Sequence, residues 1–178
     1  MPTPTRSLGP RSAPVGDGFR FLVVGFCFIL CLVNYLDRVV LSFAIGRVER
    51  DFSITDGDFG LLMSAFAIGT LLVNGLAGYL LDRFGVKLVW SIGLLGWSVV
   101  MILQGFVEVF WMFLVLRVLL GIGEGVGFPA MNRALVDWMR PGELGRAISL
   151  SLIGVPLALL IGGVTLAPLI LGVGWRWS

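Results

Sequence analysis

The sequence predicts an all-α polytopic membrane protein. Of its 178 residues, 57% are hydrophobic and only 13% are charged. The mean hydropathy of +0.98 is far above that of an ordinary soluble domain. Five apolar segments are each long enough to cross a hydrocarbon core of about 30 Å as a helix, at about 1.5 Å per residue. They lie at residues 20–45, 59–81, 88–107, 111–136 and 147–173.

The two ends of the chain differ from the apolar segments. Residues 1–18 are rich in Pro, Gly and Ser, which predicts a disordered, solvated tail. A cleaved signal peptide is not expected, because the first apolar run is too long and no small-residue cleavage site follows it. An odd number of segments that ends in the aromatic stretch GWRWS leads us to expect that the chain stops before a sixth span.

Basic residues predict the orientation in the membrane. The loops between the segments are short, so neighbouring helices are expected to be antiparallel. On the side of the N-terminus lie Arg6, Arg11, Arg20, Arg83, Lys87, Arg133, Arg140 and Arg146, and opposite them lie Arg47, Arg50 and Arg176. Because cytoplasmic loops carry an excess of Lys and Arg, the N-terminus is expected to be cytoplasmic.

Several classes of function are disfavoured by composition. The chain has no histidine, which removes the commonest general base and metal ligand, so we expect no enzyme, cofactor or metal site. The basic residues are scattered among apolar runs, so nucleic acid is not an expected partner. Cys27 and Cys31 lie one turn apart in one segment, a poor geometry for a disulfide, and are interpreted as packing residues.

Two apolar segments carry charged residues at membrane depth. Arg117 and Glu124 lie seven residues apart, about two helical turns, so both can look into one cavity. The first segment contains Asp37 and Arg38, with Asn34 one turn earlier. An ionised side chain near the bilayer centre costs about 2.5 to 3.5 kcal/mol, so these groups need partners. They indicate a substrate or ion path, and the competing interpretation is a purely structural charge network.

Glycines occur near these charged residues and also in the turn between the second and third apolar segments. Glycines at every second position from residue 121 to residue 127 predict close approach of a neighbouring helix or a ligand. The turn GYLLDRFGVK, residues 78–87, has the ordered pattern Gly-x-x-x-Asp-Arg-x-Gly. In it, Asp82 can sit against the N-terminus of an adjoining helix, and Arg83 agrees with the predicted cytoplasmic side.

This turn resembles the signature loop between the second and third helices of the major facilitator superfamily. NYLDR, RVLLGIGEG and GWRW resemble its anion:cation symporter branch, which includes galactonate, hexuronate and phthalate-type permeases. The resemblance covers residues 20–178. It implies the major facilitator fold of twelve spans in two six-helix halves, so residues 19–178 would be an incomplete N-terminal transmembrane domain with the first five helices. It also implies a bacterial inner membrane.

The resemblance also implies roles for individual residues. Proton coupling would fall to Asp37 and Glu124. Substrate binding would involve Arg38, Arg117, Tyr35, Asn34 and Asn74. A conformational latch between the two halves would involve Gly78, Asp82, Arg83 and Gly85. Thr70 and Asn74 stand where many relatives have a tyrosine and a glutamine.

Two functional interpretations follow. The preferred one is proton-coupled symport of an organic anion, a sugar acid or an aromatic carboxylate, by alternating access. Protonation of Asp37 and Glu124 would free Arg38 and Arg117 to bind the substrate carboxylate. The alternative is a non-transporting membrane scaffold or a truncated transporter remnant. The expected partners are the organic anion, protons, the lipid bilayer and a missing C-terminal half, without which the fragment is expected to be inactive.

Overall fold

The computed structural model of the chain describes residues 17–175, and every regular element in that range is a helix. The described helices are α1 (Asp17–Phe52), α2 (Asp56–Phe84), α3 (Val86–Gly105), α4 (Phe110–Gly125), α5 (Gly127–Trp138), α6 (Leu144–Leu152) and α7 (Gly154–Val173). Most of the expected tail lies outside the described residues, whereas Asp17 and Gly18 belong to the first turn of α1.

These helices form five membrane-length segments, because α4 with α5 makes one segment and α6 with α7 makes another. The prediction of five apolar spans is therefore confirmed. The largest difference in bounds is at α1, which continues to Phe52, beyond the expected end at residue 45. This extension is polar, and it carries the chain out of the apolar region before the turn into α2.

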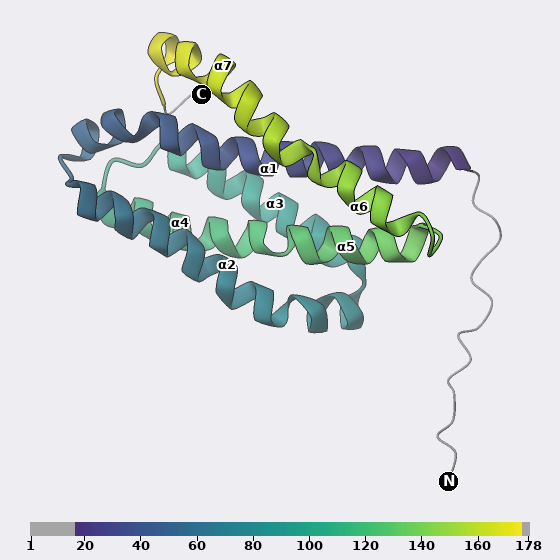
Figure 1. Cartoon of the computed structure of the whole chain (residues 1–178). Helices are drawn as coiled ribbons and strands as arrows, with labels where there is room; N and C mark the ends of the chain where they lie inside the picture. Colours follow the sequence, from purple (N-terminus) through teal and green to yellow (C-terminus); the bar gives the residue numbers. More distant parts are fainter. Residues whose placement is uncertain (1–16, 176–178) are drawn as a thin grey trace.

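Prolines account for the breaks inside the fourth and fifth spans. A proline has no N–H to donate and its ring clashes with the carbonyl group four residues earlier. Pro129 therefore disrupts the ladder at Gly125, where α4 ends. Pro156 does the same at Leu152, where α6 ends. In Figure 1, α4 and α5 nevertheless follow one another along nearly one line.

The turns between α1 and α2 and between α2 and α3 are fixed by local chemistry. Thr55 caps the start of α2: its hydroxyl accepts from the backbone N–H of Asp58 (3.4 Å), and the Asp58 carboxylate accepts from the backbone N–H of Thr55 (3.0 Å). Such a reciprocal capping box satisfies two helix-end donors. At the other end Gly85 adopts a φ of 80°, which favours glycine and reverses the chain into α3.

The packing order of the helices determines which side chains meet. α4 packs between α2 and α3, and α1 packs mainly against α6 and α7 and touches α2 only slightly. Figure 1 shows α7 crossing α1 on the side away from α2. The α1–α2 and α3–α4 turns lie at one end of the bundle, and the α2–α3 and α5–α6 turns lie at the other. Neighbouring spans are thus antiparallel, as expected.

Glycines let α2 and α4 approach closely. A Cβ atom on Gly69 would run into the main-chain oxygen of Val118, and one on Gly121 would run into that of Phe66. Thr70 adds an interhelical hydrogen bond by donating to the carbonyl oxygen of Gly121 at 3.3 Å. The predicted close approach at the glycine-rich stretch is therefore made by a neighbouring helix. A stripe of small residues is a usual device for packing helices in lipid.

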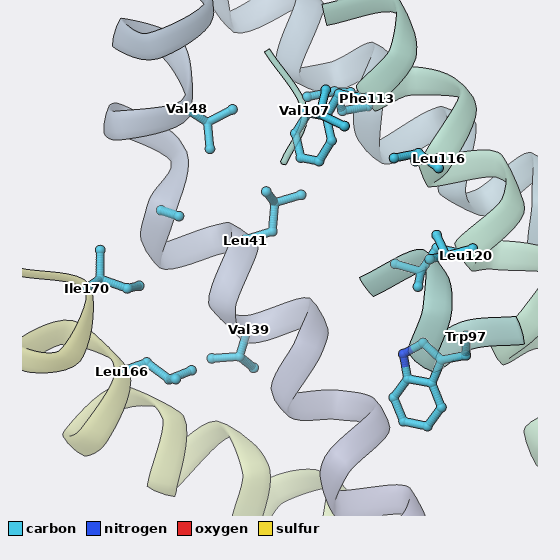
Figure 2. Packing of buried hydrophobic residues seen from close by; sticks show 13 residues of the cluster. Val39, Leu41, Val48, Trp97, Val107, Phe113, Leu116, Leu120, Leu166 and Ile170 are labelled. Carbon is cyan, nitrogen blue, oxygen red and sulfur yellow. The ribbon is translucent and has the colours of Figure 1, made fainter. Parts of the chain in front are cut away.

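One hydrophobic cluster joins α1, α2, α3, α4 and α7. Figure 2 shows Val39 of α1 turned toward Leu166 of α7, while Leu116 and Leu120 of α4 and Trp97 of α3 lie on the other side of α1. Many large apolar side chains elsewhere face outward, including Leu71, Leu95 and Leu160. An apolar outer surface is expected for a bundle that lipid surrounds.

Candidate functional site

Glu124 is the centre of the buried polar cluster. Its side chain is fully buried on α4, next to the point where the fourth span breaks. Asn34 of α1 donates its Nδ2–H to Oε2 of Glu124 at 2.9 Å, and the guanidinium of Arg38 forms an ion pair with the same oxygen at 3.5 Å. Asn34 and Arg38 lie one turn apart, so they share one face of α1. The cluster therefore ties α1 to α4.

Asp37 lies on a different face of α1 from its neighbour Arg38. Its carboxylate accepts a hydrogen bond from the indole N–H of Trp97 on α3 at 2.6 Å. In Figure 2 the indole nitrogen lies on the side of the ring that faces α1. An indole can only donate, so it suits the ionised carboxylate. Nothing in the sequence pattern distinguished Trp97 from the other apolar side chains of its span.

Arg117 is buried on α4, with its residue only 7% exposed. The guanidinium carbon stands 5.2 Å from the ring centroid of Phe113, a cation–π contact. Its Nε has no hydrogen-bond partner, and no described residue forms an ion pair with Arg117. A buried cation without a paired anion is costly in a membrane. The nearest compensating charges are the carboxylates of Glu124 and Asp37, which interact with Arg117 without forming an ion pair.

Arg117 and Glu124 line different cavities among those described, although their charges still interact. Arg117 lines a cavity of about 100 Å³ together with Asp37 and Gln104. Glu124 lines another, of about 30 Å³, together with Asn34. Seven residues bring two side chains to one face but separate them by about 10 Å along the helix axis. That distance is enough to place them at two depths of the bundle.

Gln104 is a polar residue that the sequence interpretation missed. It lies near the end of α3, is 5% exposed, and its Nε2 has no hydrogen-bond partner. Its side chain faces the same cavity as Asp37 and Arg117. A glutamine inside an apolar segment was the available signal, since a buried amide needs a partner or a water.

Among the predicted substrate-binding residues, Arg38 and Tyr35 lie beside aromatic rings, whereas Asn74 is exposed. The guanidinium carbon of Arg38 lies 5.0 Å from the ring centroid of Tyr35 and 4.9 Å from that of Phe66 on α2. Tyr35 in turn meets the ring of Phe128 edge-on. Arg38 is partly exposed, so it borders open space as well as the buried cluster. Asn74 is exposed on α2 and forms no hydrogen bond with another described residue.

The turn at residues 78–87 lies at the other end of the bundle from the α1–α2 turn (Figure 1). Asp82 forms an ion pair with Arg133 of α5 at 2.7 Å, and Arg133 also pairs with Asp137 one turn later at 3.3 Å. Arg83 donates to the hydroxyl of Tyr79. Asp82 thus pairs with the side chain of Arg133, whereas the sequence suggested the N-terminus of an adjoining helix as its partner. Gly78 is exposed, with open space where a Cβ would stand.

The two cysteines are free and buried. Cys31 places its Sγ 3.3 Å from the Sδ of Met131 on α5, and both cysteines belong to a second hydrophobic cluster. This environment agrees with the interpretation of the two thiols as packing residues.

An all-helical bundle with five membrane-length spans and a buried charge cluster defines a multi-pass integral membrane protein. Residues 27–178 match the family model described as Major Facilitator Superfamily, and the chain belongs to that family. The relatives reported below carry the names of transporters.

Two curated relatives illustrate the similarity. The chain is 36% identical over 159 residues to a probable chloroplastic anion transporter 4 of Oryza sativa subsp. japonica, covering 88% of this chain and 27% of the relative. It is 31% identical over 160 residues to the hexuronate transporter of Bacillus subtilis (strain 168), covering 88% of this chain and 37% of the relative. The chain thus spans about a third of the length of these relatives.

A solved structure shares the fold. A bacterial homologue of the human lysosomal transporter Spinster, in an inward-facing and occupied conformation, superposes with a TM-score of 0.76 at 22% sequence identity. The match covers 91% of this chain and 39% of the other. At this level of identity the likeness establishes the major facilitator arrangement of the helices, as the sequence motifs predicted.

Proposed function

We propose that this chain forms the first five spans of a proton-coupled symporter for a small organic anion, working by alternating access. The observation that carries the proposal is the buried cluster in which α1 supplies Asp37 and Arg38 and α4 supplies Arg117 and Glu124. Two carboxylates and two guanidiniums can neutralise one another when the site is empty. Ionised side chains are costly to bury in a membrane. Where they occur there, they are characteristic of substrate and proton paths.

Coupling follows from the contacts of Glu124. While its carboxylate is ionised, Oε2 holds the guanidinium of Arg38 in an ion pair at 3.5 Å. Protonation removes the negative charge, so Arg38 loses its partner inside the bundle. Arg38 is already partly exposed between two aromatic rings, and it can then pair with a substrate carboxylate through two parallel hydrogen bonds. Proton binding thus prepares the anion site.

Arg117 and Asp37 act together at the second cavity. Arg117 has no ion-pair partner among the described residues, and Asp37 faces the same cavity of about 100 Å³. Protonation of Asp37 would leave a net positive charge there. Arg117 would then attract the substrate anion. After Asp37 releases its proton, the Asp37 carboxylate would again balance the charge of Arg117. The two carboxylates are therefore assigned to proton coupling.

The relatives support the substrate class. The Bacillus subtilis relative is a hexuronate transporter, so a sugar acid is the preferred substrate, with an aromatic carboxylate as the second candidate. Tyr35 and Asn74 are assigned to the wall of the substrate-binding site that Arg38 borders. A C-terminal half of the transporter would close that site from the opposite side. We place the protein in a bacterial inner membrane with its N-terminus in the cytoplasm.

The turn between α2 and α3 is assigned to conformational latching. Asp82 and Arg83 lie at the end of the bundle that we place in the cytoplasm, and Asp82 is held by Arg133. Gly85 provides the sharp chain reversal between the two helices. In the proposed cycle this turn engages the opposing half when the cytoplasmic side closes.

Uptake by the full-length transporter tests the proposal. Proteoliposomes with an imposed inward proton gradient are supplied with labelled hexuronates, aldonates and aromatic carboxylates. We expect saturable, gradient-dependent accumulation of at least one sugar acid. The chain from Met1 to Ser178, reconstituted in the same way, should insert but not accumulate any of them. Uptake that is indifferent to the proton gradient, or absent for every organic acid, contradicts the proposal.

A further inference from the structure

Two buried oxygen atoms in the cluster have no hydrogen-bond partner: Oδ1 of Asn34 and Oε1 of Glu124. The other polar atoms of the same two groups are joined, because Nδ2 of Asn34 donates to Oε2 of Glu124 at 2.9 Å. Both side chains line the cavity of about 30 Å³. Two unsatisfied acceptors therefore belong to one amide and one carboxyl group that already touch.

The protonation state of Glu124 determines whether these acceptors can be satisfied. An ionised carboxylate and an amide oxygen can only accept, so they cannot bond to each other. A protonated carboxyl group gains one O–H donor. Placed on Oε1, that hydrogen could be donated to Oδ1 of Asn34. The acid and the amide would then be joined by two hydrogen bonds, N–H to Oε2 and O–H to Oδ1.

We propose that Asn34 is a positioning residue of the proton site, and that the transported proton is held between Oε1 of Glu124 and Oδ1 of Asn34. The inference rests on the proposed function and assigns Asn34 to the proton instead of the substrate. An O–H bond forms on Oε1 when a proton arrives from water, and the carboxylate charge of −1 becomes zero. The ion pair with Arg38 is lost in the same step, and release of the proton reverses both changes.

Charged and titratable groups surround Glu124 on several elements. α1 contributes Asp37, Arg38, Cys27 and Cys31, α4 itself contributes Arg117, and the stretches of α2, α3 and α5 that face Glu124 contribute none among the described residues. Arg38 can only donate, so it cannot accept the O–H of the protonated acid. An amide can both donate and accept. Asn34 is therefore suited to hold Glu124 in both protonation states.

A competing arrangement places one water in the cavity. A volume of about 30 Å³ holds a single water molecule, which could donate to both unsatisfied oxygens. In that case the protonated acid would not depend on the Asn34 oxygen. The two arrangements differ in the acceptor of the Glu124 hydroxyl, which is Oδ1 of Asn34 in one and a water in the other, whereas Oε2 accepts from the Asn34 N–H in both.

The test is a pH titration of the chain from Met1 to Ser178, reconstituted in lipid and followed by infrared difference spectroscopy. The C=O stretching band of protonated Glu124 is identified by its loss in Glu124→Gln. In Asn34→Leu, which has a similar volume but no polar atoms, we expect this band to move to higher wavenumber because the acid loses both hydrogen bonds. Asn34→Ser, which is smaller and keeps a hydroxyl group, should also move the band.

The matched control is Asn132→Leu, an exposed asparagine on α5 outside the cluster, which should leave the band in place. If Glu124→Gln removes no band between about pH 4 and about pH 9, Glu124 is not a proton carrier, and both the proposed function and this inference fail. If the band is present but stays in place in both Asn34 variants, the inference alone is overturned. An equal shift in Asn132→Leu likewise overturns it.

Discussion

The indole N–H of Trp97 on α3 donates to the carboxylate of Asp37 on α1 across 2.6 Å. This hydrogen bond is the direct polar link between α3 and the charge cluster. Seven residues earlier on the same face of α3, Trp90 is equally buried but meets the ring of Phe26 edge-on, with centroids 5.7 Å apart. The two tryptophans therefore form a matched pair, of which only one contacts an acid.

The first prediction uses this pair in the full-length transporter. Trp97→Phe keeps an aromatic ring but removes a hydrogen bond that favours the ionised form of Asp37. We expect the pH dependence of uptake to move toward higher pH by about one unit, since a hydrogen bond to a charged group is worth about that much. Trp90→Phe should leave the pH profile in place. Equal profiles for the two variants would show that the bond is structural.

The second prediction concerns Glu124. Glu124→Gln keeps the size of the side chain but cannot take up the proton, so a proton gradient should no longer drive accumulation of substrate above its external concentration. Exchange of labelled for unlabelled substrate should persist, because it does not require net proton movement. Both are measured in the same vesicles. Gradient-driven accumulation by this variant would remove Glu124 from the coupling mechanism.

The third prediction concerns Arg117, which is buried without an ion-pair partner among the described residues. Arg117→Lys keeps the charge but loses the planar fork that binds a carboxylate through two hydrogen bonds. The apparent affinity for substrate should fall about tenfold or more, a loss of the size expected for a hydrogen bond between charged groups. The measurement is the KM of uptake at saturating proton concentration. An unchanged KM would make Arg117 structural.

The fourth prediction concerns stability. Gly69→Leu pushes a side chain into the main chain of α4 at Val118, where no flexible group can move aside. Overpacking commonly costs about 1 to 3 kcal/mol, so the unfolding temperature in detergent should fall by roughly 5 °C or more. Gly75→Leu is the control, because no atom lies within 4 Å of a Cβ at that position of the same helix. Similar unfolding temperatures for the two variants would contradict the close packing of α2 and α4.

Much of the fold could be predicted from the sequence because lipid imposes a simple rule. A span of about 20 apolar residues must be helical, so composition alone located all five spans. The breaks near Val126 and Ile153 were missed, although Pro129 and Pro156 signalled them. A proline alone does not decide where a span breaks, because Pro168 lies inside α7 without ending that helix.

The polar contacts were harder to predict than the spans. Helix periodicity allowed Asn34 to share a face with either Asp37 or Arg38, and the structure brings Asn34 and Arg38 to Glu124. It could not reveal that Asp37 turns toward Trp97, because that depends on how α1 and α3 pack. Helix periodicity also could not show that Arg117 and Glu124 line different cavities. Two side chains on one face of a helix can still lie at different depths in the membrane.

The central claim is that proton entry and anion entry are coupled. The most direct measurement follows the external pH of weakly buffered proteoliposomes that contain the full-length transporter while a hexuronate is added. The account predicts that the external solution becomes alkaline as substrate enters, that both signals saturate together, and that both vanish in Glu124→Gln. Substrate entry with no change in external pH, at any substrate concentration, would contradict it.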